Sequence, residues 1–130
     1  MQMLRGEEHP DTISAMANLA ITLGDQGKLA EAAEMKSEVL DKRRRILGEE
    51  HPDTISAIAN LANTLGDQGK LAEAAEMRSE VLDKRRRILG EEHPDTISAM
   101  NNLAATLGDQ GKLDDAASLS KIAYMQMIEV

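Results

Sequence analysis

The chain has 130 residues, a hydrophobic fraction of 42% and a formal net charge of -8, which is enough apolar material for one domain and too acidic a balance for nucleic-acid binding. It contains no cysteine, which excludes a disulfide framework and a thiolate metal site. Aromatic residues make up only 1%, so the core must be aliphatic, which favours closely packed helices over a sheet.

One stretch of fifteen residues, GEEHPDTISAMANLA, begins at Gly6 and recurs with one substitution at Gly48 and at Gly90. The copies occupy residues 6–47, 48–89 and 90–130. Residues 1–5 align with the last five residues of a repeat, which belong to its second helix. A repeat of this period is too small to bury its own apolar face and stacks on its neighbours. The sequence therefore predicts an all-α protein, a single α-solenoid domain over residues 1–130.

The first helix of each repeat, helix A, is predicted over Asp11 to Gln26 in the first copy. Pro10 suits the first helical turn, and His9 or a neighbour is the expected N-cap. Gly27 ends the helix in a left-handed conformation. One apolar stripe is formed by residues at spacings of three and four: Ile13, Met16, Ala20 and Leu23. Leu19 lies beside this stripe.

The second helix, helix B, is predicted over Leu29 to Leu47, antiparallel to helix A. Its cationic run, DKRRR at 41–45 and again at 83–87, complements the negative end of the helix dipole and can pair with neighbouring acids. We interpret this run as a solvated helix end rather than a phosphate site. The residues expected on the buried side are Ala32, Ala33, Val39, Leu40 and Ile46.

The histidines and the Ser-His-Asp residue types invite chemical interpretations that the repetition disfavours. His9, His51 and His93 recur once per repeat, too far apart to share a zinc ion, so a capping role is predicted. Ser14 lies near His9 and Asp11, but a hydrolytic triad copied three times would require three active sites. The sequence predicts no enzyme, no catalytic residue, no metal site and no cofactor.

The chain resembles a known repeat family. Met16, Leu19, Ala20 and Leu23, then Ala32 and Lys36, fall at the positions of the tetratricopeptide pattern, with its aromatics replaced. The 42-residue length, "NLA", "QGK" and "ILGEEHPD" look like the extended repeat of kinesin light chains, also found in NLR-type signalling proteins. The resemblance implies a right-handed superhelix of antiparallel helix pairs.

In that family the helix A elements line a concave groove that binds peptides. Asparagines 18, 60 and 102 match a motif residue that approaches the ligand backbone. The positions equivalent to Ala17 and to Ile21, which we call the columns of Ala17 and Ile21, vary between the three copies and would set specificity. The implied partner-binding residues are Ser14, Ala17, Asn18, Ile21, Asp25, Ser56, Ala59, Asn60, Asn63, Asp67, Ser98, Asn101, Asn102, Ala105 and Asp109.

The expected function is therefore a non-catalytic scaffold that binds a protein or peptide. The groove columns contain Asp and no Lys or Arg, so a neutral or basic peptide fits better than the acidic cargo of kinesin light chains. The chain begins with no charged-then-apolar leader and has no apolar run approaching the roughly 20 residues that span a bilayer. A soluble, cytoplasmic protein without membrane or nucleic-acid partners is expected.

The third helix B departs from the others and supports an alternative function. Its end is apolar where the second copy is charged, although terminal repeats normally have a polar outer face. The alternative is a self-assembling module, a homo-oligomer formed through this helix or through repeat exchange, or a fragment of a longer array. The residues assigned to self-association are Leu119, Ile122, Tyr124, Met125 and Ile128.

Overall fold

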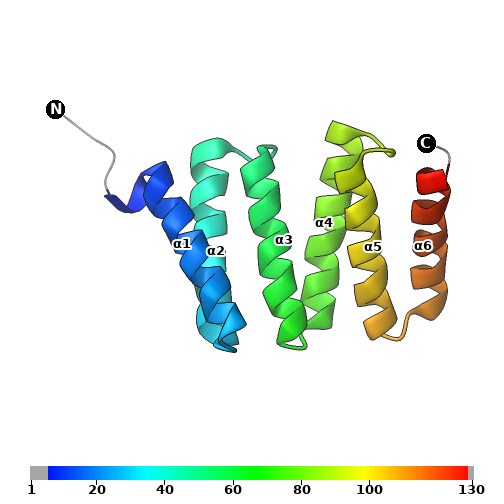
Figure 1. Ribbon diagram of the computed structural model, residues 1–130, viewed down its shortest axis with the longest axis horizontal. Helices are drawn as coiled ribbons and strands as arrows, with labels where there is room; N and C mark the ends of the chain where they lie inside the picture. Colours follow the sequence, from blue (N-terminus) through cyan, green and yellow to red (C-terminus); the bar gives the residue numbers. More distant parts are fainter. Residues whose placement is uncertain (1–5, 129–130) are drawn as a thin grey trace. The chain divides into compact units, whose positions relative to one another are not determined.

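The computed structural model describes residues 6–128, and this part of the chain is helical without strands. A short 3-10 helix, η1 (Gly6–Glu8), precedes six α-helices (Figure 1). The six helices are α1 (Pro10–Asp25), α2 (Leu29–Leu47), α3 (Pro52–Asp67), α4 (Leu71–Leu89), α5 (Pro94–Asp109) and α6 (Leu113–Ile128). Helices α1, α3 and α5 are the three copies of helix A, and α2, α4 and α6 are the copies of helix B. The predicted all-α repeat is confirmed.

The chain divides into two compact units after Gln68, between the two helices of the second repeat. In the N-terminal unit, α1 packs against α2 and α2 against α3, and successive helices run antiparallel (Figure 1). In the C-terminal unit, α4 packs against α5 and α5 against α6. The single domain over residues 1–130 stays a prediction, and its residues 1–5 lie outside the described residues.

The predicted helix ends agree with the structure to within one residue. Each helix A begins with Pro at its first turn, directly after a histidine N-cap. The histidine Nδ1 accepts a hydrogen bond from the main-chain N–H two residues on, at 3.0–3.1 Å in all three copies. Gly27 has a φ of 83°, the left-handed conformation that terminates α1. The predicted capping role of the histidines is confirmed.

The leucine beside the apolar stripe of helix A is buried only where a described helix B precedes that helix, whereas Ile13 and Ala20 of the α1 stripe are buried without one. Leu61 of α3 is 6% exposed and Leu103 of α5 is 9% exposed, and these helices pack against α2 and α4 respectively. The equivalent Leu19 of α1 is 49% exposed. The same residue type at the same helical position is therefore core or surface according to its neighbour.

A buried threonine links α3 to α2 and another links α5 to α4. Thr54 Oγ1 donates to the main-chain oxygen of Arg43, and Thr96 Oγ1 donates to that of Arg85, both at 3.2 Å. Both threonines are completely buried. Because the bond recurs in each unit, it is a regular part of how one repeat joins the next.

Two expectations about helix B are wrong. Ile46 was expected on the buried side but is 42% exposed, because it lies in the last turn of α2, beyond the packed part of the helix. Lys42 and Lys84 belong to the cationic run expected to be solvated, yet both are buried. Their aliphatic stems pack within the unit, and Lys84 Nζ lies 3.2 Å from the carboxylate of Glu80, one turn earlier.

Replacing Thr54 by Val keeps the shape of the side chain and removes the hydroxyl. We expect a loss of about 0.5–1.5 kcal/mol in the free energy of unfolding, because the hydrogen bond to Arg43 is lost in a buried site. The matched control is Thr12→Val in α1, where the threonine is half-buried and no described helix B precedes it. Urea unfolding of both variants measures the difference, and equal losses would contradict the assigned role of the bond.

Candidate functional site

The candidate site is the exposed side of the helix A elements. We call it the helix A face and define it by the fifteen predicted residues on α1, α3 and α5. Ala17, Ala59 and Asn60 are half-buried, and the other twelve are exposed. None is buried, whereas Ile55, Ile58 and Ala62 of the same α3 belong to the core. The predicted residues thus lie apart from the packed stripe of their helices.

The column that varies most between copies is accessible to solvent. It holds Ile21, Asn63 and Ala105, all of which are exposed, and Ile21 is 44% exposed. An aliphatic side chain and an amide can replace one another here because neither is buried, so no unpaired amide is left in a core. This column can change its chemistry without disturbing the fold.

A lysine that the sequence interpretation left out lies against the helix A face. Lys36 of α2 extends to α3, where its Nζ donates to the main-chain oxygen of Asn60 at 3.3 Å. A small apolar recess there is lined by Lys36, Val39 and three residues of α1 and α3: Ala17, Ala57 and Asn60. Two of these three, Ala17 and Asn60, belong to the predicted site.

The charge of Lys36 is set by two opposing effects. Burial lowers the pKa of the ammonium group from its ordinary value of 10.5, and the carboxylates of Asp67 and Asp25 raise it, with burial the larger effect. Both aspartates belong to the helix A face. Lys36, on the adjoining helix B, therefore interacts electrostatically with both aspartates.

Lys36 corrects the expectation that this surface lacks cations. The helix A columns contain no Lys or Arg, but helix B contributes one between α1 and α3. The signal was present in the sequence, because Lys36 occupies the position at which the tetratricopeptide pattern has a large aromatic. A long side chain at that position extends between adjacent helices whatever its terminal group.

The asparagines of the helix A face use their main-chain oxygens in local bonds. Asn18 and Asn102 accept from the hydroxyls of Thr22 and Thr106 one turn later, at 3.2 Å, and Asn60 accepts from Lys36. These bonds do not occupy the side-chain amides. An amide presents both donors and an acceptor, which is the pairing that a peptide backbone requires.

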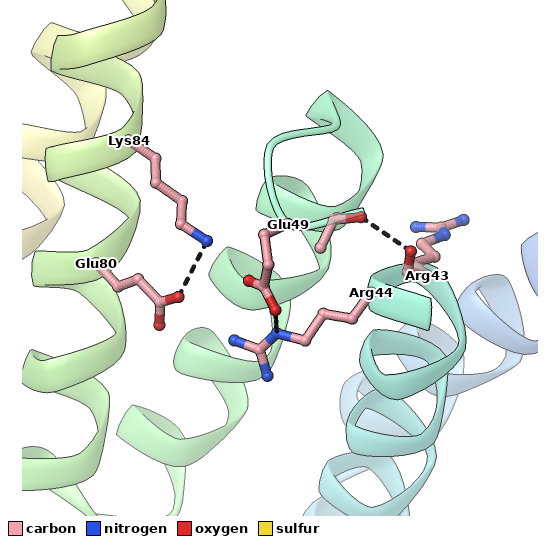
Figure 2. A network of polar contacts seen from close by, with 6 residues as sticks. Arg43, Arg44, Glu49, Glu80 and Lys84 are labelled. Atoms are coloured by element: carbon pink, nitrogen blue, oxygen red, sulfur yellow. Dashed lines mark hydrogen bonds and ion pairs between the residues drawn. The ribbon is translucent and has the colours of Figure 1, made fainter. Parts of the chain in front are cut away.

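The cationic ends of helix B are paired with acids of the neighbouring turns. In the N-terminal unit, Arg44 Nε lies 2.9 Å from the Glu49 carboxylate, and Arg45 lies 3.3 Å from Glu8 (Arg44 and Glu49 are drawn in Figure 2). In the C-terminal unit, Arg86 pairs with Glu91. The predicted pairing is confirmed, although it reaches the turn after helix B and is not limited to the helix itself.

The residues that could suggest catalysis or metal binding have other roles here. His9 Nδ1 is committed to the main chain of Asp11 at 3.1 Å and lies 3.9 Å from its carboxylate. Within residues 6–128, no group of three or more metal-ligating side chains comes together. None of the described helices combines the length and apolar character that crossing a bilayer requires.

Replacing Lys36 by Met tests the burial of its charge. Because burial lowers the pKa, the unfolded chain binds more protons than the folded chain between the lowered value and 10.5, and wild-type stability rises with pH in that window. Below this window Lys36 is protonated in both the folded and the unfolded chain, and the full cost of burying its charge lowers the stability. We expect Lys36→Met to match the wild type at pH 7 or exceed it by up to about 1 kcal/mol, and this difference to shrink at pH 10.

Urea unfolding at the two pH values measures the effect of Lys36→Met. The matched control is Lys121→Met on α6, whose lysine is exposed and whose replacement should show no such trend. A difference between Lys36→Met and the wild type that stays constant or grows from pH 7 to pH 10 would contradict the electrostatic account.

Comparisons with known proteins agree with the fold. Two family models, both described as tetratricopeptide repeat, match residues 54–124 and 12–53. No curated protein sequence matches the chain. Among solved structures, one similar chain is a Podosopora anserina protein described as a kinesin light chain with nearly identical TPR-like repeats. It is 25% identical with a TM-score of 0.85, over 97% of this chain and 59% of that one.

A second similar structure is BtubC (BKLC) from P. vanneervenii, at 23% identity and a TM-score of 0.84, over 94% of this chain and 48% of that chain. This chain thus spans about half to three fifths of the length of these solved chains. The family models together cover most of the described helices, and both structural neighbours have the same arrangement of helices. The chain belongs to the tetratricopeptide repeat family, as an array of the kinesin-light-chain-like type.

Proposed function

We propose that this chain is a non-catalytic binding module that captures a peptide segment of a partner protein on the helix A face. Tetratricopeptide repeats are in general protein–protein interaction modules, and membership of the family gives the coarse function. The finer proposal rests on the contrast between two sides of helix A. None of the predicted binding residues is buried, while in α3 and α5 most of the residues between them belong to the core.

The polar groups of the face suit a peptide backbone. Asn18, Asn60 and Asn102 recur once per repeat, and their known bonds engage only main-chain oxygens. Within the N-terminal unit, the amides of Asn18 and Asn60 can pair with peptide groups of an extended or helical ligand. The columns of Ala17 and Ile21 then contact ligand side chains and set specificity.

The charge of the face favours a neutral or basic ligand. Asp25, Asp67 and Asp109 recur at the end of each helix A and are exposed. Lys36 offsets part of the charge of the first two, but the whole chain keeps a formal net charge of -8. An acidic peptide would be repelled over a longer range than the one half-buried ammonium could attract it.

Replacing Asn60 and Asn102 by Ala should weaken a bound peptide without unfolding the chain. We expect each replacement to reduce affinity about fivefold to tenfold, the effect of losing one hydrogen bond to the ligand. The probe is a peptide selected from a random display library on the wild-type protein, and fluorescence anisotropy gives its Kd.

The matched control for the asparagine variants is Ser118→Ala, an exposed polar residue of α6 outside the helix A face. Circular dichroism checks that each variant keeps its helices. Unchanged affinity in both asparagine variants would remove the helix A face as the binding surface.

A second candidate function is self-association through α6, favoured by the exposure of its apolar residues. Tyr124 is 61% exposed, whereas the equivalent Leu82 of α4 is 3% exposed. Leu119 is half-buried, and Val130 lies outside the described residues. The other exposed apolar residues in the last turns are Ile122, Met125, Met127 and Ile128, which are 40–59% exposed.

Replacing Ile122, Tyr124 and Ile128 together by Ser tests self-association. If α6 is an assembly surface, the wild type is a dimer or larger and the triple variant is a folded monomer, because the apolar area that drives association is gone. Sedimentation over a hundredfold range of concentration measures the mass. A wild-type monomer across that range would eliminate this candidate.

A further inference from the structure

An apolar pocket opens at one end of the N-terminal unit, where η1 leads into α1, α2 ends and α3 begins. Its volume is about 110 Å³. Pro10 and Ile13 of α1 and Ile46 and Leu47 of α2 supply its apolar lining. The polar residues around it are Glu8, Ser14, Arg43, His51 and Asp53. We call it the helix-end pocket.

The aliphatic residues of this pocket are unusually open. Ile13 is buried at 4% exposure, but Ile46 is 42% and Leu47 is 39% exposed. The same pair recurs in the C-terminal unit, where Ile88 is 44% and Leu89 is 41% exposed. Covering such side chains with an apolar ligand group removes their surface from water, which is favourable.

The lining of the pocket indicates what it would bind. Its apolar residues are aliphatic and proline, Pro10, Ile13, Ile46 and Leu47, which suits a Val, Leu, Ile or Met side chain. The charges around it are balanced. Glu8 is paired with Arg45 at 3.3 Å, and Arg43 and Asp53 have opposite signs. A neutral side chain is therefore favoured over a charged one.

The pocket adjoins the helix A face through Ser14, which belongs to both. Asp25 lies eleven residues further along α1, or about 16 Å along the helix axis. An extended peptide covers that distance in about five residues. A ligand with a side chain in the pocket can thus place a basic residue beside Asp25.

We propose that the helix-end pocket is a binding subsite for one aliphatic side chain of a peptide ligand whose basic residue, five positions away, meets Asp25 on the helix A face. The subsite rests on the proposed function, and it adds the residue that anchors the ligand. Ile46 and Leu47 hold the aliphatic side chain, and Ile13 forms the floor beneath it. The spacing from Ser14 to Asp25 sets the distance between the two recognised residues.

The test is a titration of the full chain, with isoleucine methyl groups labelled for NMR, by the peptide acetyl-Leu-Ser-Gly-Ser-Ser-Lys amide. We expect saturable shifts of the Ile46 and Ile13 methyl signals. Replacing the leucine of the peptide by serine should weaken binding by about 10- to 100-fold, the effect of leaving one aliphatic side chain unburied.

Two protein variants provide the matched comparison. Ile46→Ser should abolish the difference between the leucine and serine peptides. Leu113→Ser should preserve it, because Leu113 is an exposed aliphatic residue, at 68%, that does not line the pocket. Both residues are open to solvent, so neither replacement empties the core.

Three results would overturn the subsite. The first is no shift of the Ile46 methyl with the leucine peptide. The second is equal affinity for the leucine and serine peptides. The third is an Ile46 shift that depends on protein concentration without peptide, which would identify a second copy of the chain as the occupant.

The same titration separates the subsite from the proposed function. If Asn60→Ala weakens both the leucine and serine peptides while Ile46→Ser changes neither, the helix A face binds peptides and the subsite is wrong. If Ile46→Ser matters and Asn60→Ala does not, the subsite stands and the assignment of the asparagines fails.

Discussion

The packing of this molecule depends on the contact between a helix A and the helix B that precedes it, because that contact decides how much of helix A is buried. Leu19, Leu61 and Leu103 are the same residue at the same position, and only the two that follow a helix B are buried. The threonine bonds to Arg43 and Arg85 reinforce the same contact, since each crosses from one repeat to the next. The joints between repeats therefore add to the packing within each helix pair, as expected for a solenoid whose units stack on their neighbours.

This dependence leaves one side of each helix A available for binding. The stripe that packs on helix B must remain apolar, so the accessible residues can vary without loss of stability. Ser14, Asn18 and Asp25 keep polar groups on that side. Because the helix below is held by its neighbours, these groups are fixed relative to one another within a unit, which reduces the entropy lost when a ligand binds.

Much of the fold could be predicted from sequence because the repeats are nearly identical and their ends are marked by strong local signals. The His-Pro pair and Gly27 fixed the ends of helix A to within one residue.

The expectations that were wrong concern long side chains near the end of helix B. Lys42 is buried although it lies in a cationic run, because the long aliphatic stem of a lysine can pack against apolar neighbours. Ile46 is exposed because the last turn extends beyond the packing. Lys36 reaches the helix A face from a helix that the family resemblance did not place there. The helix-end pocket combines residues of three helices, and sequence periodicity describes only one helix at a time.

If the helix A face binds a peptide as proposed, the few differences between the first two repeats would change its specificity. Only three positions differ: Met16 and Ile58, Ile21 and Asn63, and Lys36 and Arg78. The first pair exchanges one aliphatic residue for another of similar size, which a core tolerates. The second changes an exposed residue of the helix A face. The third changes a half-buried cation on helix B, and in the first repeat that cation contacts the face through Asn60.

Two of the three differences thus fall where a ligand would meet them, one on the face and one beneath it. An array built of near-copies can therefore acquire distinct binding positions by changing two side chains per repeat, while the contacts that hold the repeats together stay the same.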